Sequence, residues 1–258
     1  MSCSSILLLL IAPGVTPVEQ MYETHTYHYS GGALQEDPFR YRLLKPARVE
    51  AGRAYPLVVF LHGAGERGDD NVSQLKYLPT WMAEPERRDR FPCFLLAPQC
   101  RANDQWVRVP WGESQSRPLA REPSDAMKVV LGILDHVIST YPVDENRVYL
   151  TGLSMGGYGC WDLALRQPMR FAAVAPICGG GDESQAARLI AVPILAYHGD
   201  ADQAVPVVRT RRMIEAIRQA GGQPLYRELP GVGHDSWTAA YTNADGVVPW
   251  MFQQLRKP

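Results

Sequence analysis

Residues 148–161 read VYLTGLSMGGYGCW, and this stretch decides the fold. Its first four residues, 148–151, form the apolar run of a strand buried on both faces, and residues 155–167 have a helical pattern. Between them, residues 152–156 (GLSMG) match G-x-S-x-G in the strand–turn–helix context that a nucleophile elbow requires. The two glycines leave the room that so sharp a turn needs. The stretch therefore predicts an exposed nucleophilic serine, Ser154, at the carboxyl end of a buried strand.

Strand and helix patterns alternate on both sides of this stretch. The expected buried strands cover residues 57–61, 94–97, 148–151, 172–177 and 194–198, with a further strand at 225–229. The expected helices cover residues 124–140, with Ser124 as N-cap, and 155–167, 206–220 and 247–255. Residues 24–29 and 39–44 alternate like half-exposed strands. These patterns predict an α/β fold with a mostly parallel central sheet, helices on both faces and antiparallel N-terminal edge strands.

Length and composition bound the number of domains and the classes of partner. The 258 residues contain no internal repeat and no linker, so we expect a single catalytic domain over residues 21–258. The formal net charge of -1 offers no basic excess for a nucleic-acid backbone, which argues against that class of partner. No apolar segment is long enough to span a membrane.

The N-terminus has an incomplete signal-peptide pattern. Residues 6–12 are apolar, but no Lys or Arg precedes them and no clear A-x-A cleavage site follows. We interpret residues 1–20 as a candidate signal segment, in truncated form. Two locations stay open: secreted or periplasmic if the segment is a signal, and cytoplasmic if it is an ordinary strand.

His234 is the candidate general base for Ser154, because a serine hydroxyl needs a base to become a nucleophile. It lies in a glycine-bearing loop, residues 231–235 (GVGHD), after the strand at 225–229. The other histidines fit less well: His25 and His28 lie on an early strand, His136 lies within a helix, and His62 and His198 end strands. We expect the last two to shape their loops by hydrogen bonding.

Asp200 and Asp202 are both candidates for the acid that orients the base. Triads built on an elbow serine follow the chain order serine, acid, histidine. Residues 198–206 read HGDADQAVP and follow the strand at 194–198, so both aspartates lie at its carboxyl end. Position alone does not choose between them. If Asp202 is the triad acid, Asp200 is free to cap its own turn.

The loop after the strand at 57–61 is the candidate oxyanion loop. It reads HGAGERG, residues 62–68. One backbone N–H from this loop and one from Met155, the residue after the nucleophile, can face a developing oxyanion. Ala64 is the first choice in the loop and Gly65 the alternative. A phosphate-binding loop is excluded, because no Gly-Lys-Ser/Thr closes the segment.

Six motifs in one order resemble the carboxylesterase/phospholipase-like branch of the α/β-hydrolase superfamily. They are LHGAGERG, APQC, RVYLTGLSMGGYGCWDLA, ICGGGD, HGDADQAVPV and GHDSW. The relatives of this branch include polyhydroxybutyrate-depolymerase-like and feruloyl-esterase-like proteins, and the resemblance covers the chain from Leu57 to the C-terminus. It implies the α/β-hydrolase fold.

The resemblance also implies the roles of individual residues. Ser154 matches the family's nucleophile and His234 its histidine. The family's aspartate lies three residues before Val-Pro, which implies Asp202 rather than Asp200. The oxyanion donors of the family match Ala64 and Met155.

We expect a serine carboxylic-ester hydrolase that acts through an acyl-enzyme, with no metal and no organic cofactor. Its expected substrates are short-chain or aromatic esters of acetyl or feruloyl type, either small molecules or esters linked to plant polysaccharide. Trp111 and Trp237, with Gly65, are candidate substrate-binding residues, since aromatic rings can stack on sugars or a phenolic acyl group. The other interpretation of both tryptophans is packing. Two alternatives for the function are a serine peptidase of the same fold and a non-catalytic, hydrolase-like binding protein.

None of the five cysteines belongs to a C-x-x-C pair, so the sequence indicates neither a zinc ribbon nor a thioredoxin motif. Buried free thiols are the simpler interpretation. The alternative is a disulfide in an exported protein among Cys93, Cys100, Cys160 and Cys178. The oligomeric state stays open.

Overall fold

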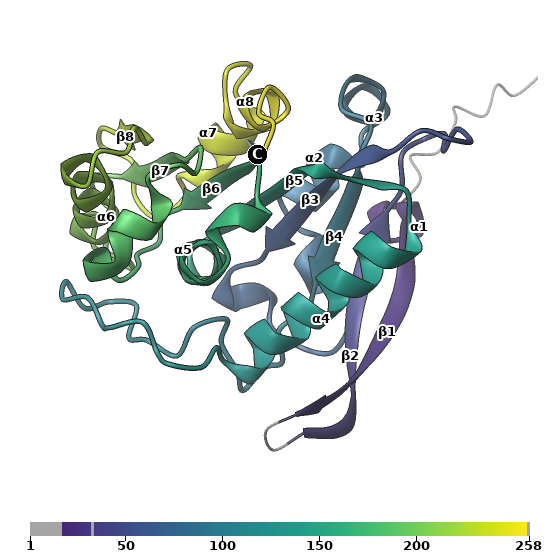
Figure 1. The fold of residues 1–258 in the computed structure, drawn as a ribbon, viewed down its shortest axis with the longest axis horizontal. Coiled ribbons are helices and arrows are strands. Elements are labelled where there is room, and N and C mark those ends of the chain that lie inside the picture. Colours follow the sequence, from purple (N-terminus) through teal and green to yellow (C-terminus); the bar gives the residue numbers. More distant parts are fainter. Residues whose placement is uncertain (1–16, 32–33, 257–258) are drawn as a thin grey trace, which may run out of the picture.

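The structure is a computed structural model that describes residues 17–31 and 34–256. Within these ranges, eight strands form one sheet in the order β1-β2-β4-β3-β5-β6-β7-β8 (Figure 1). The strands are β1 Tyr22–Gly31, β2 Leu34–Leu44, β3 Tyr55–Leu61, β4 Phe94–Pro98, β5 Val143–Leu153, β6 Ala173–Ile177, β7 Leu195–Gly199 and β8 Leu225–Leu229. The pairs β1–β2 and β2–β4 are antiparallel, and all later neighbours are parallel. This is the expected α/β-hydrolase fold, with its antiparallel strands at the N-terminal edge.

Most of the candidate signal segment lies outside the described residues. The description starts at residue 17, so the apolar run at 6–12 and Cys3 are not covered. A short helix, α1 Val18–Met21, then leads directly into β1.

Each face of the sheet carries its own apolar core, because side chains of a strand alternate between the two faces. Leu57 and Val59 of β3 face one core, and Val58 and Phe60 face the other. The first core is covered by α4 Asp125–Thr140, α5 Met155–Arg166 and α6 Val208–Gln219. The second is covered by α2 Leu78–Met82, α7 Trp237–Thr242 and α8 Val247–Met251 (Figure 1). A strand covered on both sides has no polar face, which is why β3 reads as an unbroken apolar run.

Several predicted boundaries were wrong, and four short helices were missed. The expected strand at 24–29 spans Tyr22–Gly31, the helix expected at 206–220 spans Val208–Gln219, and the helix expected at 247–255 ends at Met251. The missed helices are α1, α2, α3 (Pro85–Arg90) and α7. Helices of four to six residues are too short to show a helical period in the sequence. In α2 and α3, proline in the first turn also resembles a loop signal.

Two observations concern the cysteines and the helices. Cys93, Cys100, Cys160 and Cys178 are all buried and free, which agrees with the thiol interpretation rather than the disulfide. None of the helices in the described ranges has both the length and the apolar character that crossing a bilayer requires.

Helix α4 begins at the residue that the sequence predicts. The Ser124 hydroxyl accepts a hydrogen bond from the Met127 N–H at 3.0 Å, which satisfies one of the free amides of the first turn. The same hydroxyl donates to the Trp106 carbonyl at 2.7 Å. Ser124 therefore joins the start of α4 to the long connection that follows β4.

We expect Ser124→Ala to lower the free energy of unfolding by about 1–2 kcal/mol, because it removes a helix cap and a partly buried hydrogen bond together. Urea denaturation followed by circular dichroism measures this loss. Ser139→Ala is the matched control, since Ser139 is exposed in the last turn of the same helix. An equal loss in both variants would contradict the capping role.

Candidate active site

Ser154 lies at the sharp turn between β5 and α5, with φ 54° and ψ -116°. This region of backbone conformation is strained for a residue that carries a side chain. The Ser154 N–H donates to the Ile177 carbonyl at 2.9 Å, which ties the turn to the end of β6. The turn thus has the conformation that the elbow motif predicts, and it is held in place by the neighbouring strand.

Two glycines allow the end of β3 to approach this turn. A Cβ atom on Gly152 would lie 2.5 Å from the Leu61 carbonyl oxygen, and one on Gly156 would lie 1.8 Å from it. Both distances are far shorter than a van der Waals contact, so any side chain at these positions would displace β3. The turn was predicted to require small residues, and the close packing of β3 requires them as well.

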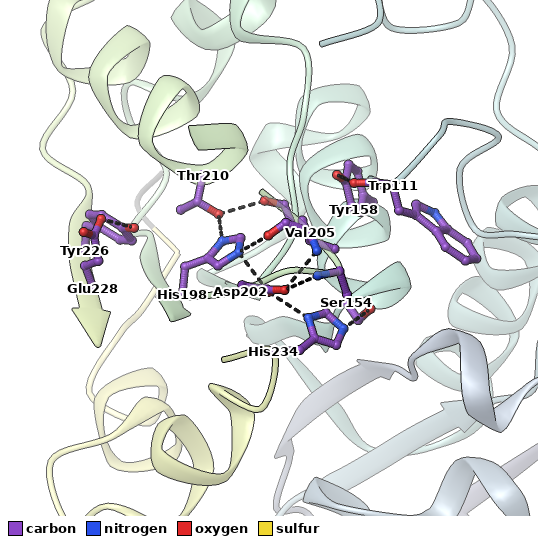
Figure 2. Close-up of polar contacts among 12 residues, drawn as sticks. Trp111, Ser154, Tyr158, His198, Asp202, Val205, Thr210, Tyr226, Glu228 and His234 are labelled. Carbon is purple, nitrogen blue, oxygen red and sulfur yellow. Dashed lines mark hydrogen bonds and ion pairs between the residues drawn. The ribbon is translucent and has the colours of Figure 1, made fainter. Parts of the chain in front are cut away.

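Ser154, His234 and Asp202 are joined by hydrogen bonds, as Figure 2 shows. His234 Nε2 lies 2.9 Å from Ser154 Oγ, and His234 Nδ1 lies 2.7 Å from Asp202 Oδ2. These residues come from the elbow, the loop after β8 and the loop after β7. The His234 side chain is 30% exposed, whereas that of Asp202 is fully buried. The arrangement places a base against the serine hydroxyl, and it keeps the acid out of water.

The Asp202 carboxylate accepts hydrogen bonds at both oxygens. Oδ1 accepts the N–H groups of Ala204 and Val205 at 2.8 and 2.9 Å, and Oδ2 faces His234 and His198. Burial opposes ionisation, but the hydrogen bonds from the two histidines and from the Val205 amide lower the pKa of Asp202 well below its usual range. Asp202 is therefore ionised at neutral pH and can hold the proton of His234 on Nδ1.

Asp200, the other candidate acid, has a different role. Its Oδ1 accepts the N–H of Gly231 at 2.7 Å, in the loop that carries His234. The prediction that Asp200 caps its own turn was therefore wrong, because its hydrogen-bond partner, Gly231, lies in a different loop. The residue joins the loop after β7 to the loop after β8, which lie side by side because these strands are parallel neighbours.

His198 contacts Asp202, and the sequence did not predict this contact. The side chain is completely buried, and its Nε2 lies 3.0 Å from the Val205 carbonyl and 3.2 Å from Asp202 Oδ2. Both are acceptors, so we assign the hydrogen to Nε2 from this network. Nδ1 lies 2.8 Å from the hydroxyl of Thr210. The expected loop-shaping role is present, and in addition His198 Nε2 lies against the acid that orients His234.

The loop after β3 lies beside the elbow. A Cβ atom on Gly63 would meet the Leu153 side chain at 2.8 Å, just before the nucleophile. His62 Nε2 accepts the Cys100 N–H at 3.0 Å, which leaves Nδ1 to donate to the Gly63 carbonyl at 2.6 Å. Burial lowers the pKa of His62 to about 4, so this histidine is neutral. As expected, His62 shapes its loop by hydrogen bonding.

Ala64 and Gly65 lie in a short 3-10 turn, Ala64–Glu66, that follows Gly63. The Arg67 guanidinium donates to the Ala64 carbonyl at 2.9 Å and fixes this turn from its far side. Within the described ranges, the backbone N–H groups of Ala64 and Met155 have no hydrogen-bond acceptor. An oxyanion site requires backbone amides without a partner, and these two come from the loop after β3 and from the residue after the nucleophile.

The two candidate substrate-binding tryptophans lie on different elements. The Trp237 ring meets the His234 ring edge-on, with centroids 5.2 Å apart, and the Tyr77 ring packs on Trp237 at 5.4 Å. Trp111 lies near Tyr158 in Figure 2 and accepts the Tyr158 hydroxyl at its carbonyl, at 3.1 Å. Both indoles are partly exposed. No local sequence pattern predicts a role for Tyr77, since only its position beside Trp237 marks it.

One set of metal-type ligands comes together in the described part of the chain: Cys178, Asp202 and His234, whose ligand atoms lie within 4.8 Å of one another. Burial raises the pKa of the Cys178 thiol far above its ordinary value, which disfavours the thiolate that a metal binds. Asp202 and His234 already bond each other. This donor set suits a hydrogen-bonded pair better than a metal ion.

Comparison with known proteins identifies the family of this chain. The model of the Phospholipase/Carboxylesterase family matches residues 47–245, which include the elbow and the loop of Asp202. The chain belongs to this family. As a member, it is a carboxylesterase-like hydrolase with an ester substrate.

Several individual proteins are similar to this chain. A solved structure of a thermostable esterase is 37% identical with a TM-score of 0.84, and the match covers 93% of this chain and 64% of that one. A probable inactive carboxylesterase of Oryza sativa subsp. japonica is 28% identical over 83% of this chain and 90% of its own length. Feruloyl esterase D of Neurospora crassa is 26% identical over 78% of this chain and 67% of its own.

We expect Gly156→Ala to prevent the native fold, because its new Cβ would overlap the Leu61 carbonyl of β3. Soluble yield and thermal unfolding measure the effect. Gly233→Ala is the matched control, since a Cβ atom there meets nothing within 4 Å. A Gly156→Ala protein with a normal melting temperature would contradict the close approach of β3 to the elbow.

We expect His198→Phe to lower kcat/KM about tenfold, because Asp202 loses one charge-assisted hydrogen bond. Without that donor the pKa of Asp202 rises and the carboxylate accepts more strongly from His234. The acid limb of the kcat/KM profile should therefore move to higher pH. Thr210→Val, which leaves the His198–Asp202 contact in place, should keep the wild-type acid limb. If the acid limb of the kcat/KM profile does not move in His198→Phe, His198 does not act on Asp202.

Proposed function

We propose that the protein is a serine carboxylesterase that forms an acyl-enzyme on Ser154. The observation that carries the proposal is the hydrogen-bonded chain from Ser154 Oγ through His234 to Asp202, at 2.9 and 2.7 Å. Family membership alone is weaker support, since the relative in Oryza sativa is described as probably inactive. The geometry of this chain's own residues is therefore the stronger argument.

In the first half-reaction, Ser154 Oγ attacks the ester carbonyl carbon while His234 Nε2 takes the hydroxyl proton. The oxyanion that forms accepts hydrogen bonds from the N–H groups of Ala64 and Met155. The bond from carbon to the alcohol oxygen then breaks, and His234 returns its proton to the leaving alcohol. Asp202 stabilises the imidazolium through its bond to Nδ1.

The second half-reaction repeats these roles with water. His234 takes a proton from water as its oxygen attacks the acyl carbon, and the same amides hold the new oxyanion. The bond to Ser154 Oγ then breaks, His234 returns the proton to that oxygen, and the acid leaves. Every proton transfer in this sequence involves His234, and Asp202 stays ionised throughout because its pKa is low.

For the substrate, we propose a short-chain or aromatic ester of acetyl or feruloyl type, including esters carried by plant polysaccharide. Trp237 lies beside His234 and Trp111 lies beside Tyr158, and both tryptophans are partly exposed, so a phenolic ring or sugar can stack on them. The likeness to feruloyl esterase D supports the aromatic acyl group.

The proposal is tested with p-nitrophenyl acetate, butyrate and palmitate, methyl ferulate, acetylated xylan and a peptide amide. We expect turnover of acetyl or feruloyl esters, and a loss of about 10⁴-fold or more in Ser154→Ala, because the nucleophile is absent. Ser139→Ala, an exposed serine of α4, is the matched control and should keep full activity.

Other outcomes would contradict the proposal in different ways. Full ester hydrolysis by Ser154→Ala would remove the assigned nucleophile. Turnover of the amide alone would indicate a peptidase, and silence of the folded wild type on every compound would favour a binding protein.

A further inference from the structure

A cavity of about 390 Å³ lies one helical turn beyond Ser154 along α5. Tyr158, Asp162 and Arg166 form one wall, because residues four apart share a face of a helix. Arg209 of α6 lies on a second wall, and the connection between β4 and α4 covers the cavity. Tyr158 follows Ser154 by four residues, or about 6 Å along the helix. The cavity thus starts close to the reacting serine, although no residue of the proposed mechanism lines it.

Arg209 is the unusual residue of this cavity. It is 1% exposed, and its Nη1 donates to the carbonyls of Glu113 and Gln115 at 3.2 and 2.8 Å. In the described ranges, Nε and Nη2 have no hydrogen-bond partner, and no carboxylate lies within 4.0 Å of the guanidinium. Buried cations are normally paired, since an unpaired charge loses its hydration with nothing in return.

The other cations that line the cavity all have carboxylate partners. These pairs are Arg108 with Asp104, Arg117 with Glu113, Lys128 with Asp125 and Arg166 with Asp162. Asp182, which also lines the cavity, accepts the Leu119 N–H at one oxygen and the Ser184 N–H at the other. Asp125, Asp162 and Asp182 are therefore engaged elsewhere, and the fourth lining acid, Glu122, is exposed and lies farther than 4.0 Å from the guanidinium, so Arg209 is the lining cation without a carboxylate partner.

The free edge of Arg209 has the shape that recognises a carboxylate. Nε and Nη2 present two parallel N–H donors, which match the two oxygens of a carboxylate. A Cβ atom on Gly180 would lie 3.0 Å from Nε, so a side chain at this position would crowd this edge. The Tyr158 ring lies 5.3 Å from the guanidinium carbon and supports the side chain from one side.

We propose that this cavity binds a carboxylate group, with Arg209 as its charged partner. The rim at Arg117, Pro118 and Ala120 is exposed, so a small acid can enter from solvent. The carboxylate can belong to a free acid or to the substrate itself, because the cavity begins one turn from Ser154. Only the second source rests on the proposed esterase function.

The binding test uses benzoate and its neutral isostere benzamide, titrated calorimetrically into the full chain carrying Ser154→Ala. We expect benzoate to bind at least tenfold more tightly than benzamide. This preference should disappear in Arg209→Gln, which removes the charge and the two-donor edge. Equal binding of the two compounds, or a preference that survives Arg209→Gln, would overturn the proposal.

A second variant keeps the test independent of whether Arg209→Gln folds. Ala120→Glu adds a carboxylate at the exposed rim and should also abolish the preference by repelling the ligand. Ala51→Glu makes the same change at an exposed turn before β3, away from the cavity, and should retain the preference. If Ala120→Glu and Ala51→Glu show the same preference for benzoate over benzamide, the ligand does not bind in this cavity.

The source of the carboxylate is tested with 4-nitrophenyl hydrogen succinate and its methyl ester. A tenfold fall in their kcat/KM ratio in Arg209→Gln would assign the carboxylate to the substrate. An unchanged ratio with lost benzoate binding would assign the cavity to a free acid. If neither ester is hydrolysed, the esterase proposal fails, while the benzoate titration still tests the cavity.

Discussion

The backbone at Ser154 is held in a strained conformation, and the functional part of the molecule is arranged around that constraint. The strain persists because the Ser154 N–H bonds the end of β6 and because β3 packs its Leu61 carbonyl against two glycines of the turn. The same close approach brings the loop after β3 beside the elbow. The nucleophile and the candidate oxyanion amides are therefore positioned by one set of backbone contacts.

The charges and hydrogen bonds that complete this arrangement come from the loops after β7 and β8, which lie on the opposite side of β5 from β3 in the strand order. Asp202 is fully buried, yet two amides and two histidines stabilise its charge. Only one of these histidines, His234, reaches the serine and is partly exposed. The other, His198, is closed in among Thr210, Val205 and the carboxylate. Two chemically identical side chains thus differ in role because one lies in the loop after β8 and the other at the buried end of β7.

The connection between β4 and α4 links the active site to the neighbouring cavity. Trp111 of this segment bonds Tyr158 through its carbonyl, and the carbonyls of Glu113 and Gln115 hold Arg209. Arg209 lies on α6, the helix that follows the Asp202 loop, and Tyr158 lies on α5, the helix that follows Ser154. A ligand in the cavity would therefore contact the helices that follow the acid and the nucleophile. The cavity and the active site share their supporting elements, although they do not share side chains of the mechanism.

The sequence by itself determined the elements that have a long hydrophobic pattern or a strict motif. The elbow, the buried strands, α4 with its Ser124 cap and the residues Ser154 and His234 follow from local pattern, and resemblance chose Asp202. Local pattern could not show α1, α2, α3 and α7, which are too short for a helical period. It also could not show the bond from His198 to Asp202, the partner of Asp200 or the packing of Tyr77 on Trp237. Those contacts join residues on different strands and loops, so their distances depend on strand order and register, which only the tertiary structure decides.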